Sequence, residues 1–414
     1  MMKGIHVKSE IAPLKKVLLH RPGKELLNLT PDTLQELLFD DIPFLKVAQE
    51  EHDAFAQLLR DNGVEVVYLE DLMTEVLDLN PKLIKPFLYQ WLEEGNIKTK
   101  KWQDKCYNYL ITNFKGKDLV EKTMEGITLK EMGGKDLSDY SLQDRIAPND
   151  DLVVAPMPNL YFQRDPFASV GEGVFLHRMH YPTRNRETIY ADYIFKYHPD
   201  FAGYITRYYD RDYHASIEGG DVFNLTDSVV CIGISQRTEP DAVEMAARHL
   251  FNDPDCTVRT VLAFKIPSSR AFMHLDTVFT RIDVDKYTVH PAIIGPLDVY
   301  EITPEKGGDP EELHIEKLDM TLEAILEKYT GVSHVELIYC GGDDLIAAAR
   351  EQWNDGSNTL CIAPGVIVCY ERNDITNAIL REKGLSVLTI PSAELSRGRG
   401  GPRCMSMPLW REDE

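Results

Sequence analysis

The sequence has no long apolar run and no paired cysteine motif. None of its 414 residues lies in a stretch approaching the roughly 18 consecutive apolar residues that a membrane helix needs. The first 16 residues lack the apolar segment of a signal peptide, and the seven cysteines are scattered without a C-x-x-C pair. We therefore expect a cytoplasmic protein with no membrane partner, no disulfide framework and no structural zinc site.

Basic residues are also in short supply. The chain has 45 Lys and Arg residues against 67 Asp and Glu residues, a net charge of -22. Because phosphate binding needs a basic surface, this charge argues against a nucleic-acid partner. The same field attracts small cations.

The chain carries a weak internal repeat of strand and helix patterns. Helices are expected at 47–62, 186–197, 241–251, 321–329 and 374–383, with strands before and after each of them. Five such units, each with an unburied edge or face, are most economically arranged around an axis, as in a five-bladed α/β propeller. An open Rossmann-like sheet is the alternative, although no G-x-G-x-x-G motif opens a helix.

Residues 74–150 interrupt this repeat. They are rich in Lys and Leu and show helical spacing through Leu83, Phe87 and Trp91. We expect a helical insertion domain over 74–150, with 1–73 and 151–414 forming the α/β domain.

Two acidic residues stand beside proline or glycine at the edges of these units. Asp165 precedes Pro166, which favours an extended backbone, and Glu218 precedes the glycine pair at 219–220, which permits the close approach of a ligand. Side chains at such edges can converge on the opening of a single pocket. Simpler interpretations are a surface ion pair of Arg164 with Asp165, and a bulge with a solvated Glu218.

The segment 273–280 predicts a strand. In a strand, His274 and Asp276 share one face, because side chains two residues apart point to the same side. A histidine and an acid on one face suit acid–base catalysis, since the imidazole pKa lies near neutral pH. A buried core histidine is the simpler interpretation.

Cys404 follows a segment with three arginines, 397–403, that also contains three glycines. This setting favours the thiolate form of the cysteine. Four other cysteines lie inside apolar strand patterns and are expected to be buried and inert: Cys231, Cys340, Cys361 and Cys369.

A cysteine nucleophile, a histidine and three carboxylates suit a cationic substrate better than an acyl group. A guanidinium offers five N–H donors in a planar fork, which carboxylates match in pairs. Its carbon would then be the electrophile.

These residues occur in motifs that resemble those of the arginine deiminases, in the guanidine-modifying (pentein) superfamily. The resemblance runs along the whole chain and rests on five motifs: Glu-Leu-Leu-Phe-Asp-Asp at 36–41, Asn-Leu-Tyr-Phe-x-Arg-Asp-Pro at 159–166, Ile-Glu-Gly-Gly-Asp at 217–221, His-Leu-Asp-Thr-Val-Phe-Thr at 274–280, and Arg-Gly-x-Gly-Gly-Pro-Arg-Cys-Met-Ser-Met-Pro at 397–408. It implies a five-bladed, pseudo-symmetric α/β propeller with an inserted helical bundle. It also implies hydrolysis of L-arginine to L-citrulline and ammonia, in arginine catabolism, with no metal or organic cofactor.

The resemblance also implies a role for each site residue. Cys404 resembles the family nucleophile and His274 the general acid and base, while Asp165 and Asp276 hold the guanidinium and Glu218 orients His274 and touches the substrate. The residues expected to bind the rest of the substrate are Asn159, Phe162, Arg184, Arg237, Arg399, Gly398 and Leu38, with Arg184 and Arg237 gripping its α-carboxylate.

Alternatives remain within and outside this enzyme class. Agmatine deiminase is disfavoured because agmatine has no carboxylate for Arg184 and Arg237. Dimethylarginine hydrolase and amidinotransferase are further alternatives, and a non-catalytic arginine-binding pentein would be expected to lack Cys404 or His274. We also expect a homo-oligomer, a dimer or tetramer, with the helical insertion at a subunit contact.

Overall fold

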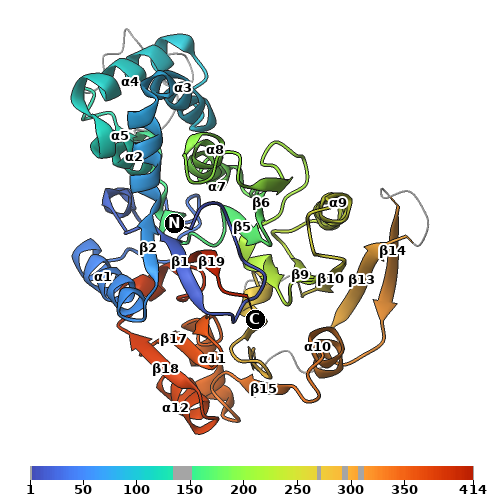
Figure 1. The fold of residues 1–414 in the computed structure, drawn as a ribbon. Helices are drawn as coiled ribbons and strands as arrows, with labels where there is room; N and C mark the ends of the chain where they lie inside the picture. Colours follow the sequence, from blue (N-terminus) through green and yellow to red (C-terminus); the bar gives the residue numbers. More distant parts are fainter. Residues whose placement is uncertain (1, 134–151, 268–271, 291–296, 306–311, 414) are drawn as a thin grey trace.

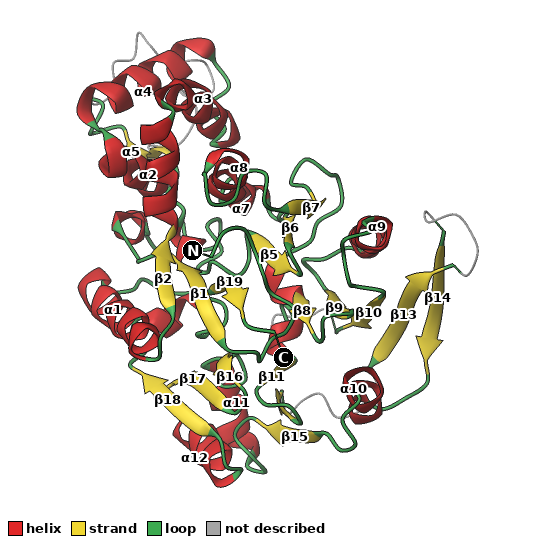
Figure 2. Ribbon diagram, viewed as in Figure 1, coloured by secondary structure: helices red, strands yellow, loops and turns green. Residues whose placement is uncertain are grey.

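The computed structural model describes residues 2–133, 152–267, 272–290, 297–305 and 312–413. Within these ranges the chain is a mixed α/β protein in which small sheets lie around the centre and most helices lie outside them (Figure 2). No helix in the described ranges has both the length and the apolar character needed to cross a membrane.

Five sheets share one pattern of pairing. In each, a middle strand pairs antiparallel with one neighbour and parallel with the other. The middle strands are β1 (Leu14–Leu19), β6 (Gly173–Leu176), β9 (Val229–Ile234), β12 (Lys286–Val289) and β17 (Val366–Tyr370). Their antiparallel neighbours are β19 (Met407–Arg411), β5 (Phe167–Val170), β8 (Val222–Asn224), β11 (Phe279–Arg281) and β16 (Leu360–Ala363).

A helix links each middle strand to its parallel neighbour. The parallel strands are β2 (Glu65–Tyr68), β7 (Thr206–Tyr209), β10 (Thr260–Lys265), β15 (Glu336–Tyr339) and β18 (Ser386–Ile390). The linking helices are α1 (Leu45–Asp61), α8 (Thr188–Tyr197), α9 (Pro240–Asn252), α10 (Leu322–Thr330) and α12 (Asp374–Glu382), and they lie at the periphery (Figure 1). All five expected helices are therefore present, each within two residues of its expected bounds.

Four elements of the fold were not expected from the sequence. No antiparallel partner was expected for β1, whereas the structure pairs β1 with β19 near the other end of the chain. A hairpin of β13 (Asp298–Pro304) and β14 (Leu313–Leu318) extends the β8–β9–β10 sheet to five strands. Helix α11 (Leu345–Trp353) connects β15 to β16.

The expected insertion contains a group of helices at one end of the molecule (Figure 1). They are α2 (Leu69–Leu79), α3 (Ile84–Glu94), α4 (Lys100–Asn113) and α5 (Gly116–Glu125), followed by the strand pair β3 (Ile127–Thr128) and β4 (Leu152–Val154). The helical segment thus begins at Leu69, before the expected boundary at 74. Residues 134–150 of the expected insertion lie outside the described residues.

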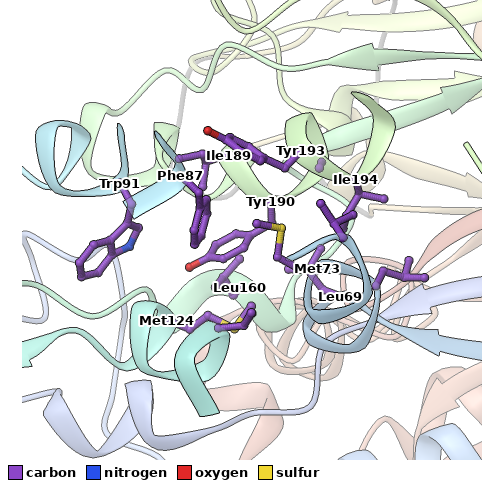
Figure 3. Packing of buried hydrophobic residues seen from close by; sticks show 14 of the residues in the cluster. Leu69, Met73, Phe87, Trp91, Met124, Leu160, Ile189, Tyr190, Tyr193 and Ile194 are labelled. Carbon is purple, nitrogen blue, oxygen red and sulfur yellow. The ribbon is translucent and has the colours of Figure 1, made fainter. Parts of the chain in front are cut away.

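These helices pack firmly against α8. Figure 3 shows Met73 of α2, Phe87 and Trp91 of α3 and Met124 of α5 gathered around Tyr190, and the four apolar side chains are fully buried. The Tyr190 hydroxyl lies 2.9 Å from the Thr123 hydroxyl of α5. Because one continuous cluster joins the two parts, a movement of α5 can be transmitted to the α/β part of the chain.

Candidate active site

Cys404 lies in a turn between a short 3₁₀ helix, η7 (Leu395–Gly398), and β19. Its backbone N–H donates to Asn358 Oδ1 at 3.1 Å, and its carbonyl accepts from the Arg164 N–H at 3.0 Å. Gly401 permits this approach, because a Cβ there would lie 2.3 Å from the Asn358 carbonyl oxygen. The cysteine is held from both sides and is 9% exposed.

His274 and Glu218 form a buried pair. His274 Nε2 lies 2.9 Å from Glu218 Oε2, and Glu218 is completely buried, which rules out the solvated bulge. Gly220 makes room for the ring, because a Cβ there would lie 2.5 Å from His274 Nδ1.

The expected strand over 273–280 is wrong at its beginning. Residues Leu275–Thr277 form a 3₁₀ turn, η6, and β11 starts only at Phe279. The turn forms because Asp221 Oδ1 accepts the Leu275 N–H at 2.8 Å and the His274 carbonyl accepts the Thr277 N–H. His274 and Asp276 therefore reach one pocket through a tight turn and not through a shared strand face.

Asp165 and Asp276 each have one oxygen paired and one oxygen without a partner. Arg184 Nη1 donates to Asp165 Oδ2 at 2.8 Å, and Arg403 Nη1 donates to Asp276 Oδ2 at 2.9 Å. The other oxygen of each carboxylate is buried with no hydrogen-bond partner among the described residues. Asp276 Oδ2 is also 3.6 Å from Cys404 Sγ. The pocket thus presents two unpaired carboxylate oxygens near the thiol.

Arg164 is not part of a surface ion pair with Asp165. Both residues are 4% exposed, and Arg164 Nε donates to the Arg403 carbonyl at 3.2 Å. The segment before Asp165 therefore supports the loop that carries Cys404.

The pKa of His274 is raised to about 9. Burial alone would lower it, but the hydrogen bond with Glu218 and the charges of Asp165 and Asp221 more than offset that effect. The imidazole is therefore protonated at neutral pH and can act as a general acid.

The expectation that the arginine-rich segment keeps Cys404 as a thiolate is wrong. Burial raises the pKa of the thiol well above its usual value, and nearby carboxylates raise it further, with Arg403 opposing them. The arginines have other partners: Arg397 pairs with Asp41, the Arg399 guanidinium lies 3.5 Å from the ring centre of Trp353, and Arg403 binds Asp276. This environment therefore favours the thiol form of Cys404.

Arg184 and Arg237 both hold carboxylates in this structure. Besides Asp165, Arg184 binds Glu187 at 2.8 Å. Arg237 Nη1 lies 3.2 Å from Glu218 Oε2, and its guanidinium lies 4.6 Å from the ring centre of Tyr181. Arg184 thus contacts Asp165, which lines the pocket, and Arg237 contacts Glu218, which binds His274.

One small cavity, of ≈ 40 Å³, brings the expected residues together. Every expected site residue lines it except Glu218, which lies behind His274: the lining residues are Leu38, Asn159, Phe162, Asp165, Arg184, Arg237, His274, Asp276, Gly398, Arg399 and Cys404. Asn159 Nδ2 also donates to the Leu37 carbonyl at 2.7 Å. Since ligand pockets usually enclose roughly 300 Å³ or more, the wall has to move for a substrate to enter.

Asp355, Met273 and Thr277 also line the cavity and were not expected there from the sequence. Asp355 is 9% exposed, and burial raises its pKa to about 7. The turn-forming run Asn-Asp-Gly-Ser-Asn at 354–358, which also contains the Asn358 that holds Cys404, was the available signal. Among the described residues, no group of three histidine, cysteine or carboxylate side chains is placed to hold a metal ion.

Comparison with known proteins gives concordant results. The family model described as arginine deiminase matches residues 35–411. An arginine deiminase of Treponema denticola is 57% identical over 412 residues and covers 100% of both chains, and one of Clostridium perfringens is 53% identical and covers 99% of both.

Two solved structures show a similar fold at low sequence identity. SxtG, an amidinotransferase from Microseira wollei, has a TM-score of 0.53 at 13% identity, covering 99% of this chain and 98% of its own. A variant of DDAH from Pseudomonas aeruginosa complexed with citrulline has a TM-score of 0.52 at 12% identity, covering 95% and 99%. The chain therefore shares the mixed α/β fold of these proteins.

Proposed function

The chain belongs to the arginine deiminase family, and from this premise we propose that its pocket hydrolyses the guanidinium of L-arginine to L-citrulline and ammonia. The observation that carries the proposal is the pair of buried carboxylate oxygens, one on Asp165 and one on Asp276, that have no partner among the described residues. A planar guanidinium satisfies both oxygens and places its carbon near Cys404 Sγ, which is 3.6 Å from Asp276.

The substrate itself supplies the charge that the nucleophile lacks. Asp276, Asp165 and Asp355 are the carboxylates that raise the pKa of Cys404. A bound guanidinium offsets their charges and so lowers the pKa of the thiol. We propose that the thiolate forms when arginine binds, which limits side reactions of the resting enzyme.

Two proton transfers at His274 complete the reaction. The Cys404 thiolate attacks the guanidinium carbon, and protonated His274 donates to the departing nitrogen, so that ammonia leaves and a covalent Cys404 adduct remains. Neutral His274 then takes a proton from water, whose oxygen attacks the same carbon. The carbon–sulfur bond breaks, the remaining hydroxyl proton passes to solvent, citrulline is released and the Cys404 thiolate is restored.

The five similar sheets support a finer proposal for the fold. Each sheet has the same antiparallel and parallel pairing and an outer helix, and the five lie around the centre of the molecule (Figure 1). We propose that they are five blades about a pseudo-symmetry axis, with the helices of 74–150 as an inserted domain between 1–73 and 151–414.

Two further proposals concern the cell and the assembly. The seven cysteines are free and buried, which suits a reducing cytoplasm. The homo-oligomer, a dimer or tetramer, remains a proposal that sedimentation of the purified chain can test.

Purified protein should release citrulline and ammonia from L-arginine in a one-to-one ratio. Agmatine and N-methylated arginines, assayed in parallel, should be poor substrates, because the pocket has buried arginines for a carboxylate and little space around the guanidinium. Preferential turnover of agmatine would refute the assignment of L-arginine as substrate.

Arg237→Ala should impair arginine more than agmatine. A charge-assisted hydrogen bond is worth about 1.5–3 kcal/mol, so the ratio of kcat/KM values for the two substrates should fall by about tenfold or more. The ratio is the informative quantity, because the loss of Arg237 also disturbs Glu218 and hence both reactions. Arg237→Lys is the matched control and should recover part of the ratio; an unchanged ratio in Arg237→Ala would exclude a carboxylate-binding role.

A further inference from the structure

A second cavity, of ≈ 520 Å³, lies between the α/β part of the chain and the helical segment. One wall is the loop after β1 and the 3₁₀ helix η1 (Lys24–Asn28), and the opposite wall is the end of α4 with α5. Its volume falls in the range of roughly 300–1,000 Å³ that is typical of small-molecule sites. None of the residues expected at the active site lines it.

The inner part of this cavity is built from buried charges. His20 Nδ1 lies 2.8 Å from Glu70 Oε2, and His20 Nε2 lies 3.2 Å from Glu25 Oε1. All three side chains are at least 95% buried, and the two carboxylates raise the pKa of His20 to about 10 against the effect of burial. The cluster is held in one geometry, as a preformed binding surface requires.

Most cations at the cavity are already neutralised. Arg21 binds Asp53 at 2.6 Å, Lys117 binds Asp71 at 2.7 Å, and Lys122 binds Glu125 at 2.9 Å. These ion pairs leave little free positive charge for an anionic ligand.

Three exposed charged residues also line the cavity. Lys24, on η1, and Asp118, on α5, have no ion-pair partner among the described residues. Glu121, one turn after Asp118, is 3.9 Å from Lys117, which binds Asp71 more closely. Burial is the main cause of a raised pKa for Glu121; the charges of Glu70 and Asp118 also raise it, and the charge of Lys117 opposes them. The cavity therefore offers one cation on one wall and two acids on the other.

We propose that this cavity is a second binding site for a basic amino acid, with the ligand's cationic group at Asp118 and Glu121 and its carboxylate at Lys24. A zwitterion with an additional positive charge matches this arrangement, because both acids and the lysine gain a partner. The site is separate from the pocket at Cys404 and does not use its chemistry.

Both walls continue into the substrate pocket. The chain leaving η1 reaches Leu37, whose carbonyl accepts from Asn159, and Leu38, which lines the pocket. On the other side, the Met124 carbonyl of α5 accepts from the Met157 N–H at 3.0 Å, two residues before Asn159. A ligand in this cavity therefore fixes the distance between η1 and α5, and by doing so it changes the affinity of the pocket for its substrate.

The proposal is tested by calorimetric titration of L-arginine into the full-length Cys404→Ala variant, in which the ligand stays intact. Two binding events are expected. In the same background, the pair Asp118→Asn and Glu121→Gln should abolish one event and keep the other. The matched control is Glu382→Gln, at an exposed position of α12, which should keep both.

A third variant tests the orientation of the ligand. Lys24→Ala should weaken the second event by about tenfold or more for L-arginine, since a charge-assisted hydrogen bond is lost, but not for agmatine, which has no carboxylate. A single event that survives the Asp118 and Glu121 changes would overturn the proposal. Failure of the proposed function is seen separately, as absence of citrulline release by the wild-type chain.

Discussion

Cys404→Ala is expected to lower the turnover of L-arginine by about 10⁴-fold or more. The Cys404 thiol lies 3.6 Å from Asp276 Oδ2 in the pocket, and no other cysteine lines that cavity. Without the sulfur there is no covalent adduct, and water would have to attack a resonance-stabilised guanidinium directly. The measurement is citrulline release at saturating arginine, with binding followed separately to show that the pocket remains intact.

The matched control is Cys361→Ala. Cys361 is a buried cysteine of β16 whose thiol donates to backbone carbonyl oxygens, among them that of Ala363 at 3.0 Å, and it is absent from the pocket. This variant should keep nearly the wild-type turnover, with some loss of thermal stability. If Cys404→Ala retained substantial turnover, or if mass spectrometry of wild-type protein quenched during turnover placed the adduct on another residue, the assignment of the nucleophile would be wrong.

Glu218→Gln is expected to lower turnover at neutral pH by about 10²-fold or more, the usual contribution of a general acid. In the wild type, the Glu218 carboxylate helps to raise the pKa of His274 to about 9, so kcat should fall as pH rises through about 9 and His274 loses its proton. Glutamine keeps the shape of the side chain but not its charge. The alkaline limb of the kcat profile should therefore move to lower pH, toward the ordinary histidine value near 6.5.

The same pair makes a pH-dependent contribution to stability. Because the pKa of His274 is raised in the folded protein, its contribution is fully present below about pH 6.5 and is lost as pH rises through about 9.

Glu187→Gln is the control for the kcat profile and should leave the alkaline limb in place. Glu187 is a buried carboxylate that binds Arg184 and has no hydrogen bond to His274. An alkaline limb that stays at the same pH in Glu218→Gln, with kcat merely scaled down, would show that Glu218 does not set the proton affinity of His274.

Much of the fold could be predicted because its helices bury one regular face. In α1, Phe55, Ala56 and Leu59 are completely buried at helical spacing. Pairing between distant segments could not be predicted in the same way. The β1–β19 pair depends on a contact between the two ends of the chain, for which local periodicity holds no information.

The candidate site, like the fold, could be predicted only where the local sequence determines it. The motifs, and the family resemblance that they carry, indicated twelve residues for the site, and eleven of the twelve line one cavity. The alternation of side chains between two faces could not distinguish a strand from the 3₁₀ turn at 275–277, because that turn is held by the distant carboxylate of Asp221. The pKa of Cys404 could not be predicted from its neighbours in the sequence. It depends on the distant carboxylates Asp276, Asp165 and Asp355, and on the acids that already pair with the nearby arginines.

The pairing of β1 with β19 has a consequence for how the protein is made. Arg411 of β19 donates to the carbonyl of Ala12, across 399 residues of chain. At a synthesis rate of about 5–20 residues per second, β1 waits tens of seconds or more on the ribosome for this neighbour. During that time an unpaired strand edge is open to the wrong partner. Cys404 emerges together with the missing strand, so the pocket that it lines is completed only when this first sheet can close.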